Sequence, residues 1–132
     1  MVAALRALVE NDFTTDFERV DWRIDPSAQE RVDVLQPLIA ETAYFAAREL
    51  VRNAAKYARG GESLRKVLLT VRLVCAGEWL RLEIEDDGVG PQPDPGNGSG
   101  LRIHGALLAA VGGSLEVSRG EQKGTLGVII LT

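Results

Sequence analysis

Two runs of alternating residues, joined by a tight turn, constrain this fold more than any other feature of the sequence. In residues 67–75 an apolar set (Val67, Leu69, Val71, Leu73, Cys75) alternates with a second set (Leu68, Thr70, Arg72, Val74). In residues 80–85 leucine and isoleucine alternate with Arg81, Glu83 and Glu85. Such a period of two predicts an antiparallel hairpin turning at residues 76–78, with one face buried and the other in solvent.

The remaining segments supply further strands and the helices that cover the buried face. A long helix is predicted from Pro37, which suits a first helical turn, to Ala58, before the glycine pair at 60–61. Apolar residues at helical spacing form its expected buried stripe: Leu38, Ile39, Phe45, Ala46, Leu50, Ala54 and Ala58. A short helix is expected at 1–9, a second helix at 101–111, and strands at 17–25, 114–118 and 125–131. The sequence thus predicts the α/β class: a two-layer α/β sandwich with helices on one face of a mixed, mostly antiparallel sheet.

Length, charge and cysteine content exclude several classes of protein. The chain has 132 residues, enough for one domain, and a net charge of -4 that disfavours nucleic acid as a partner. A single cysteine, Cys75, excludes an internal disulfide or a cysteine-based zinc cluster. No apolar run approaches the ~20 residues of a membrane span, so we expect no membrane contact and a cytoplasmic location.

Three polar groups share one face of the predicted long helix. At ~100° per residue, Glu49, Asn53 and Lys56 fall within about 60° of one another. Oxygen ligands suit Mg²⁺ and an ammonium suits phosphate, so the row fits a metal–phosphate pair. A solvated polar face with helical side-chain pairs is the alternative interpretation.

Two glycine-containing segments lie at the ends of predicted elements. Asp86 and Asp87 follow an apolar strand directly and precede Gly88 and Gly90. Glycines there allow close approach of a flat ligand, and a carboxylate can accept a hydrogen bond from an exocyclic amine. Residues 96–101 (GNGSGL) open the next helix, where free amides form an anion site. An ordinary Asp/Gly turn and a glycine-rich linker are the alternatives for the two segments, and neither a Rossmann nor a Walker A motif is present.

In order, these segments resemble the ATP-binding domain of the GHKL superfamily, the Bergerat fold shared by gyrase B, Hsp90, histidine kinases and MutL. The pattern is ExxxNAxKY on a helix (49–57), DxGxG after a strand (86–90), and GxGxGL into a helix (96–101). Within the superfamily the chain looks most like the catalytic domain of a two-component sensor histidine kinase, over roughly residues 17–131. A short segment between the two glycine boxes, and glutamate at position 49, are similar to the NarX/DesK-like branch.

The resemblance implies roles for the helix residues. Asn53 would ligate Mg²⁺, with Glu49 beside it as an acid/base group or further metal contact. Lys56 would contact phosphate, and Tyr57 would lie against the nucleotide.

It also implies roles for the loops. Asp86 would accept a hydrogen bond from the adenine amine, Gly88 and Gly90 would line the base pocket, and Thr125 would close it. The residues expected at the phosphates are Gly98, Ser99, Gly100 and Leu101.

From the same resemblance we expect residues 1–12 to be a linker helix from an upstream domain and 13–132 the ATP-binding domain. This domain would bind Mg²⁺ and ATP for phosphoryl transfer to a histidine on a separate dimerisation domain, and would be inactive alone. A response regulator would be a further partner, and the full-length protein would be a homodimer. His104, the one histidine, is assigned to the helix surface or to partly buried packing and not to catalysis. Trp22, Phe45 and Trp79 are assigned to the core or to packing on the sheet.

Three alternatives keep the fold and change the function. An anti-sigma-factor-type serine kinase has the same domain without an attached histidine domain. A hydrolase of the gyrase or MutL kind would need a lysine from a following domain. A non-catalytic nucleotide-binding regulatory module is favoured by the apolar segment 103–108, which departs from the family's charged pattern.

Overall fold

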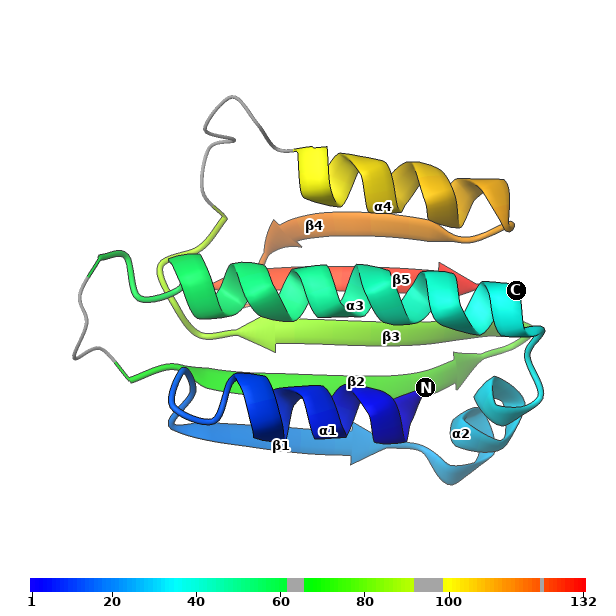
Figure 1. The fold of residues 1–132 in the computed structure, drawn as a ribbon, viewed down its shortest axis with the longest axis horizontal. Helices are drawn as coiled ribbons and strands as arrows, with labels where there is room; N and C mark the ends of the chain where they lie inside the picture. The colour runs from blue at the N-terminus through cyan, green and yellow to red at the C-terminus, as the bar shows by residue number, and fades with distance from the viewer. Residues whose placement is uncertain (62–65, 92–98, 122) are drawn as a thin grey trace.

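A five-stranded sheet with helices on one face forms the structure, a computed structural model that describes residues 1–61, 66–91, 99–121 and 123–132 (Figure 1). The elements in order are α1 (Val2–Asp12), β1 (Arg19–Ile24), α2 (Pro26–Asp33), α3 (Pro37–Tyr57), β2 (Leu68–Ala76), β3 (Trp79–Asp86), α4 (Ser99–Ala110), β4 (Ser114–Arg119) and β5 (Thr125–Leu131). The strand order is β1-β2-β3-β5-β4. Only β1 and β2 pair in parallel, so the predicted mixed, mostly antiparallel α/β sandwich is confirmed.

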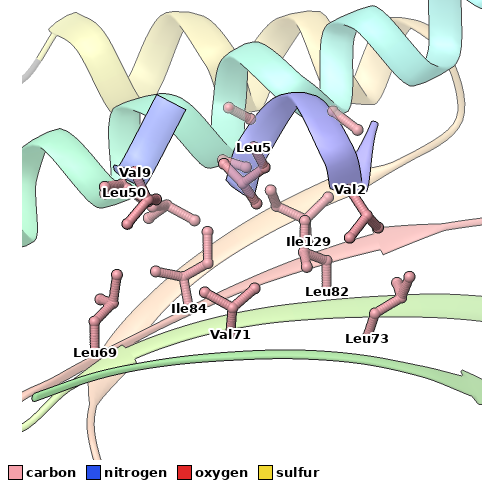
Figure 2. Packing of buried hydrophobic residues seen from close by; sticks show 14 of the residues in the cluster. Val2, Leu5, Val9, Leu50, Leu69, Val71, Leu73, Leu82, Ile84 and Ile129 are labelled. Carbon is pink, nitrogen blue, oxygen red and sulfur yellow. The ribbon is translucent and has the colours of Figure 1, made fainter. Parts of the chain in front are cut away.

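The core lies between the sheet and the helices α1 and α3 (Figure 2). Alanines make α3 narrow on its inner face, where Ala43, Ala46 and Ala47 are fully buried. The helix therefore comes so close to β5 that a Cβ on Gly127 would lie 2.5 Å from Cδ2 of Leu50. Such close packing fixes the carboxyl-terminal half of α3 over the centre of the sheet.

The predicted hairpin is present, and its alternation divides the two faces as expected. Ala76 pairs with Trp79, and Gly77 takes a positive φ of 65° in the turn between them. Leu80, Leu82 and Ile84 face the core. The residues between them project onto the outer face.

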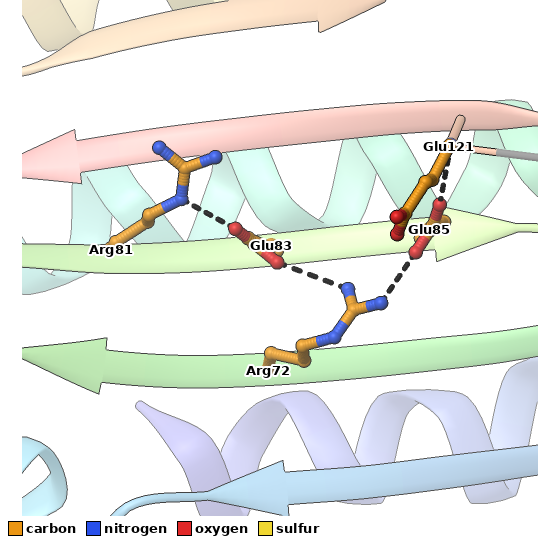
Figure 3. Close-up of polar contacts among 5 residues, drawn as sticks. All are labelled: Arg72, Arg81, Glu83, Glu85 and Glu121. Atoms are coloured by element: carbon orange, nitrogen blue, oxygen red, sulfur yellow. Dashed lines mark hydrogen bonds and ion pairs between the residues drawn. The ribbon is translucent and has the colours of Figure 1, made fainter. Parts of the chain in front are cut away.

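Ion pairs join the charged side chains of that outer face (Figure 3). Arg72 bonds Glu83 at 3.0 Å and Glu85 at 2.5 Å, and Arg81 bonds Glu83 at 2.5 Å. A hollow of about 390 Å³ opens beside them, and its lining is mixed in charge: Arg23, Leu68, Thr70, Arg72, Glu85, Asp86, Asp87, Glu121 and Lys123. Because much of this charge is already compensated, the outer face presents no single-sign surface.

The eight-residue helix α2 was not predicted. Asp25, the last residue of the strand predicted at 17–25, instead caps this helix, and Pro26 begins it: Oδ1 of Asp25 accepts a hydrogen bond from the amide of Ser27 at 3.1 Å. Arg31 in its last turn donates to the carbonyl oxygens of Gly77 and Glu78, which fixes α2 to the hairpin turn.

Two packing predictions were wrong. Leu38, assigned to the buried stripe, is 65% exposed because it lies in the first turn of α3, ahead of the buried positions that begin at Ala43. Trp79 is 49% exposed because it alternates with Leu80 and so shares the outer face with Arg81. Trp22 and Phe45, also assigned to packing, are both half-buried.

The amino-terminal helix α1 packs into the same core. Val2, Leu5 and Val9 are buried against the sheet (Figure 2), and the helix continues to Asp12, beyond the predicted end at Val9. A linkage to an upstream domain stays a prediction. None of the helices in the described ranges is both long and apolar enough to cross a membrane.

Candidate functional site

Most of the predicted site residues lie at one end of the molecule. The carboxyl ends of α3, β3 and β4 and the amino ends of α4 and β5 meet there, at the left in Figure 1. Backbone N–H and C=O groups at the ends of helices lack hydrogen-bond partners within the helix, and ligands commonly bind at such ends and at the loops that join them.

Asp86, the last residue of β3, is the one charged side chain classed with the buried residues in the described part of the chain, at 5% exposed. Its Oδ1 accepts hydrogen bonds from the amides of Gly88 at 2.9 Å and Thr125 at 3.3 Å. Described residues give Oδ2 no hydrogen bond, so this oxygen can accept one from a ligand. Loss of hydration on burial raises the pKa of the Asp86 carboxyl above its ordinary value; the nearby charges of Asp87 and Glu85 act in the same direction, against the two amides.

The next residue, Asp87, has a different role. Its Oδ1 accepts from the amide of Leu68 at 2.8 Å and so joins the loop to the start of β2. The loop also touches α3: the amide of Val89 donates to the carbonyl oxygen of Ala58 at 3.0 Å, and a Cβ on Gly88 would lie 2.3 Å from that same oxygen. Gly88 is therefore required by packing against the end of α3, whatever it contributes to a pocket.

The polar row on α3 borders this end of the sheet. Glu49 is 15% exposed in its side chain and pairs with Arg52 at 3.5 Å. Asn53 is half-buried one turn further along. Lys56 is exposed, with Nζ 5.3 Å from the ring centroid of the half-buried Tyr57.

The amino end of α4 meets this row. A Cβ on Gly100 would lie 2.6 Å from Oε1 of Glu49, so the carboxylate lies against the first turn of the helix. Ser99 begins α4 and Leu101 is half-buried, whereas Gly98 lies outside the described residues. Thus the first and third predicted segments, about fifty residues apart in sequence, are in contact.

Two residues at this end were missed by the sequence analysis as contributors to the site. Gly124 has a φ of 84°, and a Cβ there would overlap the carbonyl oxygen of Asp86, so only glycine lets β5 start beside that aspartate. Arg119 ends β4, and its Nη1 lies 2.9 Å from the position of a Cβ on Gly90. The position of Gly124 before Thr125 was visible in the sequence, whereas nothing in the sequence places Arg119 beside Gly90.

Oxygen donors for a cation are available on α3. Asn53 and Glu49 lie one helical turn apart and suit Mg²⁺ chemically. The described residues contain no group of three or more acidic, histidine or cysteine side chains that could hold a metal by themselves. A divalent cation here would therefore need ligands from a bound phosphate as well.

Comparisons with known proteins identify the family and the fold. The sequence model of the family described as "Histidine kinase-, DNA gyrase B-, and HSP90-like ATPase" matches residues 40–132. The histidine kinase domain of the blue-light activated histidine kinase EL346 from Erythrobacter litoralis superposes with a TM-score of 0.73 at 26% identity, covering 96% of this chain and 60% of that one. No curated protein matches at the level of sequence.

Two further structures share the fold. The mycobacterial sensor histidine kinase MprB has a TM-score of 0.69 at 20% identity, covering 99% of this chain and 93% of its own. The histidine kinase AdeS of Acinetobacter baumannii has a TM-score of 0.68 at 16% identity, covering 99% and 62%. The chain thus spans less than two thirds of the EL346 and AdeS chains. With the family model matching most of its length, the chain belongs to the histidine kinase-, DNA gyrase B- and HSP90-like ATPase family, in its histidine kinase-like form.

Proposed function

We propose that the chain is the ATP-binding catalytic domain of a cytoplasmic two-component sensor histidine kinase of the NarX/DesK-like branch. It binds ATP with Mg²⁺ and presents the γ-phosphoryl group to a histidine on a separate dimerisation domain. A response regulator then receives the phosphoryl group, and the full-length protein is a homodimer. The observation that carries the proposal is the buried carboxylate of Asp86, held by two amides through one oxygen and left with the other for a ligand.

Selection of adenine follows from that geometry. An exocyclic amine is a donor, and Oδ2 of Asp86 is an acceptor without a described partner. A guanine would direct its carbonyl oxygen at the carboxylate, so two acceptors would face each other. Burial destabilises the charged carboxylate in the ligand-free protein, and the same low-dielectric surroundings strengthen its hydrogen bond to a ligand.

The phosphate end of the nucleotide lies towards α3 and α4 in this proposal. Amides in the first turn of α4 and the Lys56 ammonium attract the phosphates, Asn53 and Glu49 face the cation, and Tyr57 flanks the nucleotide. When bound, Mg²⁺ neutralises charge on the phosphates. In the transfer, a nitrogen of the acceptor histidine forms a bond to the γ-phosphorus. The bond between the γ-phosphorus and the oxygen that bridges it to the β-phosphate breaks, and ADP leaves.

The acceptor histidine is assigned to another domain because His104 is poorly placed. It is the one histidine of the chain and lies on α4, half-buried, with its Nδ1 buried and without a hydrogen-bond partner among described residues. The isolated domain should therefore bind nucleotide and show little turnover.

Titration of the protein with a fluorescent ATP analogue tests the proposal. Saturable, Mg²⁺-dependent binding is expected, and Asp86→Asn should weaken it about 10- to 100-fold, since a hydrogen bond to a charged group is lost. Asp33→Asn, an exposed position on α2, is the matched control and should leave the affinity unchanged. Absence of saturable binding, or equal affinity for Asp86→Asn and wild type, contradicts the proposal.

A further inference from the structure

Arg119 projects from the sheet on the side of the helices. It is the last residue of β4 and pairs with Thr125 on β5. Two residues earlier, Val117 pairs with Gly127, the glycine against which Leu50 of α3 packs. Because side chains two residues apart share a face, Arg119 points to the same side as α3 and the candidate site.

The guanidinium of Arg119 lies at the rim of the loop that follows Asp86. Its Nη1 and Cζ are 2.9 Å and 3.4 Å from the position of a Cβ on Gly90. The end of β4 that carries Arg119 and the start of α4 lie at the same end of the molecule (Figure 1). The guanidinium thus lies beside Gly90, at the end of the sheet where α4 begins.

The charge balance of the site requires more cations than α3 provides. ATP carries several negative charges, and the Asp86 carboxylate, which makes no ion pair with a described residue, adds one more near it. On α3, Arg52 is paired with Glu49, and the Arg48 guanidinium lies over the Phe45 ring, with Cζ 4.8 Å from its centroid. Lys56 is the α3 cation that the resemblance assigns to the phosphates. Arg119 is exposed, and in residues 1–61, 66–91, 99–121 and 123–132 it makes no ion pair.

From these observations we infer that Arg119 is a further nucleotide-binding residue, whose guanidinium pairs with the phosphate oxygens from the sheet side, opposite Lys56. The inference rests on the proposed function and adds a specific contact to it. A guanidinium presents a planar pair of donors that matches two phosphate oxygens, and it keeps its charge at any working pH. Nucleotides would therefore be distinguished from nucleosides partly by this residue.

Competition titrations with ATP and adenosine against the fluorescent analogue, using the 132-residue protein, test this role. Arg119→Ala should weaken ATP binding about tenfold, the loss expected for one charge-assisted hydrogen bond, and weaken its dependence on salt. Adenosine affinity should change less than about twofold, since adenosine has no phosphate. Arg119→Lys should recover part of the ATP affinity, because it restores the charge without the planar donor pair.

Arg23→Ala is the matched control. Arg23 is another exposed arginine, on β1, paired in register with Arg72 of the outer face, and its removal should leave both affinities unchanged. An unchanged ATP affinity in Arg119→Ala, or equal losses for ATP and adenosine, overturns the phosphate contact while leaving the proposed function intact. Failure of the wild-type protein to bind ATP overturns both, and that result comes from the wild-type titration alone.

Discussion

Two adjacent aspartates at the end of β3 have different roles. Asp87 accepts a hydrogen bond from the amide of Leu68 and so joins the end of β3 to the start of β2. Asp86 is buried and keeps one oxygen without a described partner. The sequence assigned the ligand contact to Asp86 only through the family pattern, and that contact stays a prediction. Strand alternation adds a physical reason, since Asp86 follows Leu82 and Ile84 on the inner face.

The buried carboxylate of Asp86 should reduce the stability of the ligand-free protein at neutral pH. The pKa of the Asp86 carboxyl is raised above 3.8 in the folded protein. The contribution of this group to stability is therefore fully present at pH values below the pKa of the unfolded chain, where the carboxyl is neutral. It is lost as the pH rises through the pKa of the folded protein and the buried group ionises. Asp86→Asn keeps an oxygen acceptor for Gly88 and Thr125 and never ionises. We expect it to raise the free energy of unfolding by about 1 kcal/mol at pH 7, and by much less near pH 3.5.

Thermal unfolding of both proteins at the two pH values measures this difference. A stability gain of the same size at both pH values would assign the effect to packing and would contradict the electrostatic explanation. Asp33→Asn, at an exposed position, should show no pH-dependent difference.

Elements with strong periodicity were predicted closely, and elements held by tertiary contacts were not. The long helix was placed at 37–58 and is observed at Pro37–Tyr57, and the hairpin strands agree to within one residue at each end. Helix α2 was missed because its eight residues depend on the Arg31 contacts to the hairpin turn. The contact between Gly100 and Glu49 could not be predicted from the sequence either, because no local pattern specifies how α4 packs against α3.

The glycines of this protein differ in whether there is room for a side chain, and substitution of two of them by alanine tests this difference. Gly105 lies inside α4, and a Cβ placed on it would have Cβ of Leu115 as its nearest neighbour, at 4.0 Å, so Gly105→Ala should stabilise the protein by about 0.5–1 kcal/mol. Gly88→Ala would force a Cβ to 2.3 Å from the Ala58 carbonyl oxygen and should destabilise the protein by about 2 kcal/mol or more. Urea unfolding of both variants is the measurement. A destabilised Gly105→Ala would mean that α4 is strained or docks differently.

At the scale of the whole molecule, the two faces of the sheet are used differently. The inner face holds the hydrophobic core, and the outer face carries ion pairs among strand side chains. The candidate site lies on the helix side of the sheet but at one end of it, where the strand ends, α3 and α4 meet (Figure 1). Ligand contacts can therefore change there with little cost to the core.

The same division predicts what α1 contributes. Leu5 is 1% exposed in the core, and Arg6 lies with Cζ 4.7 Å from the Trp22 ring centroid, so α1 is held to the sheet over β1 and β2, away from the site. Leu5→Ala should lower the free energy of unfolding by about 2–4 kcal/mol while leaving the affinity for ATP in the folded protein unchanged. Leu38→Ala, at a leucine 65% exposed on α3, is the matched control and should lower the free energy of unfolding by less than about 0.5 kcal/mol.

Denaturant unfolding and nucleotide titration of both variants show whether residues 1–12 belong to the folding unit or only link it to another domain. A large loss in Leu5→Ala alone makes α1 part of the folding unit, so that any upstream domain joined to it would be coupled to this core through a packed helix. Equal, small losses would instead restrict the folding unit to residues 13–132 and leave α1 as a linker.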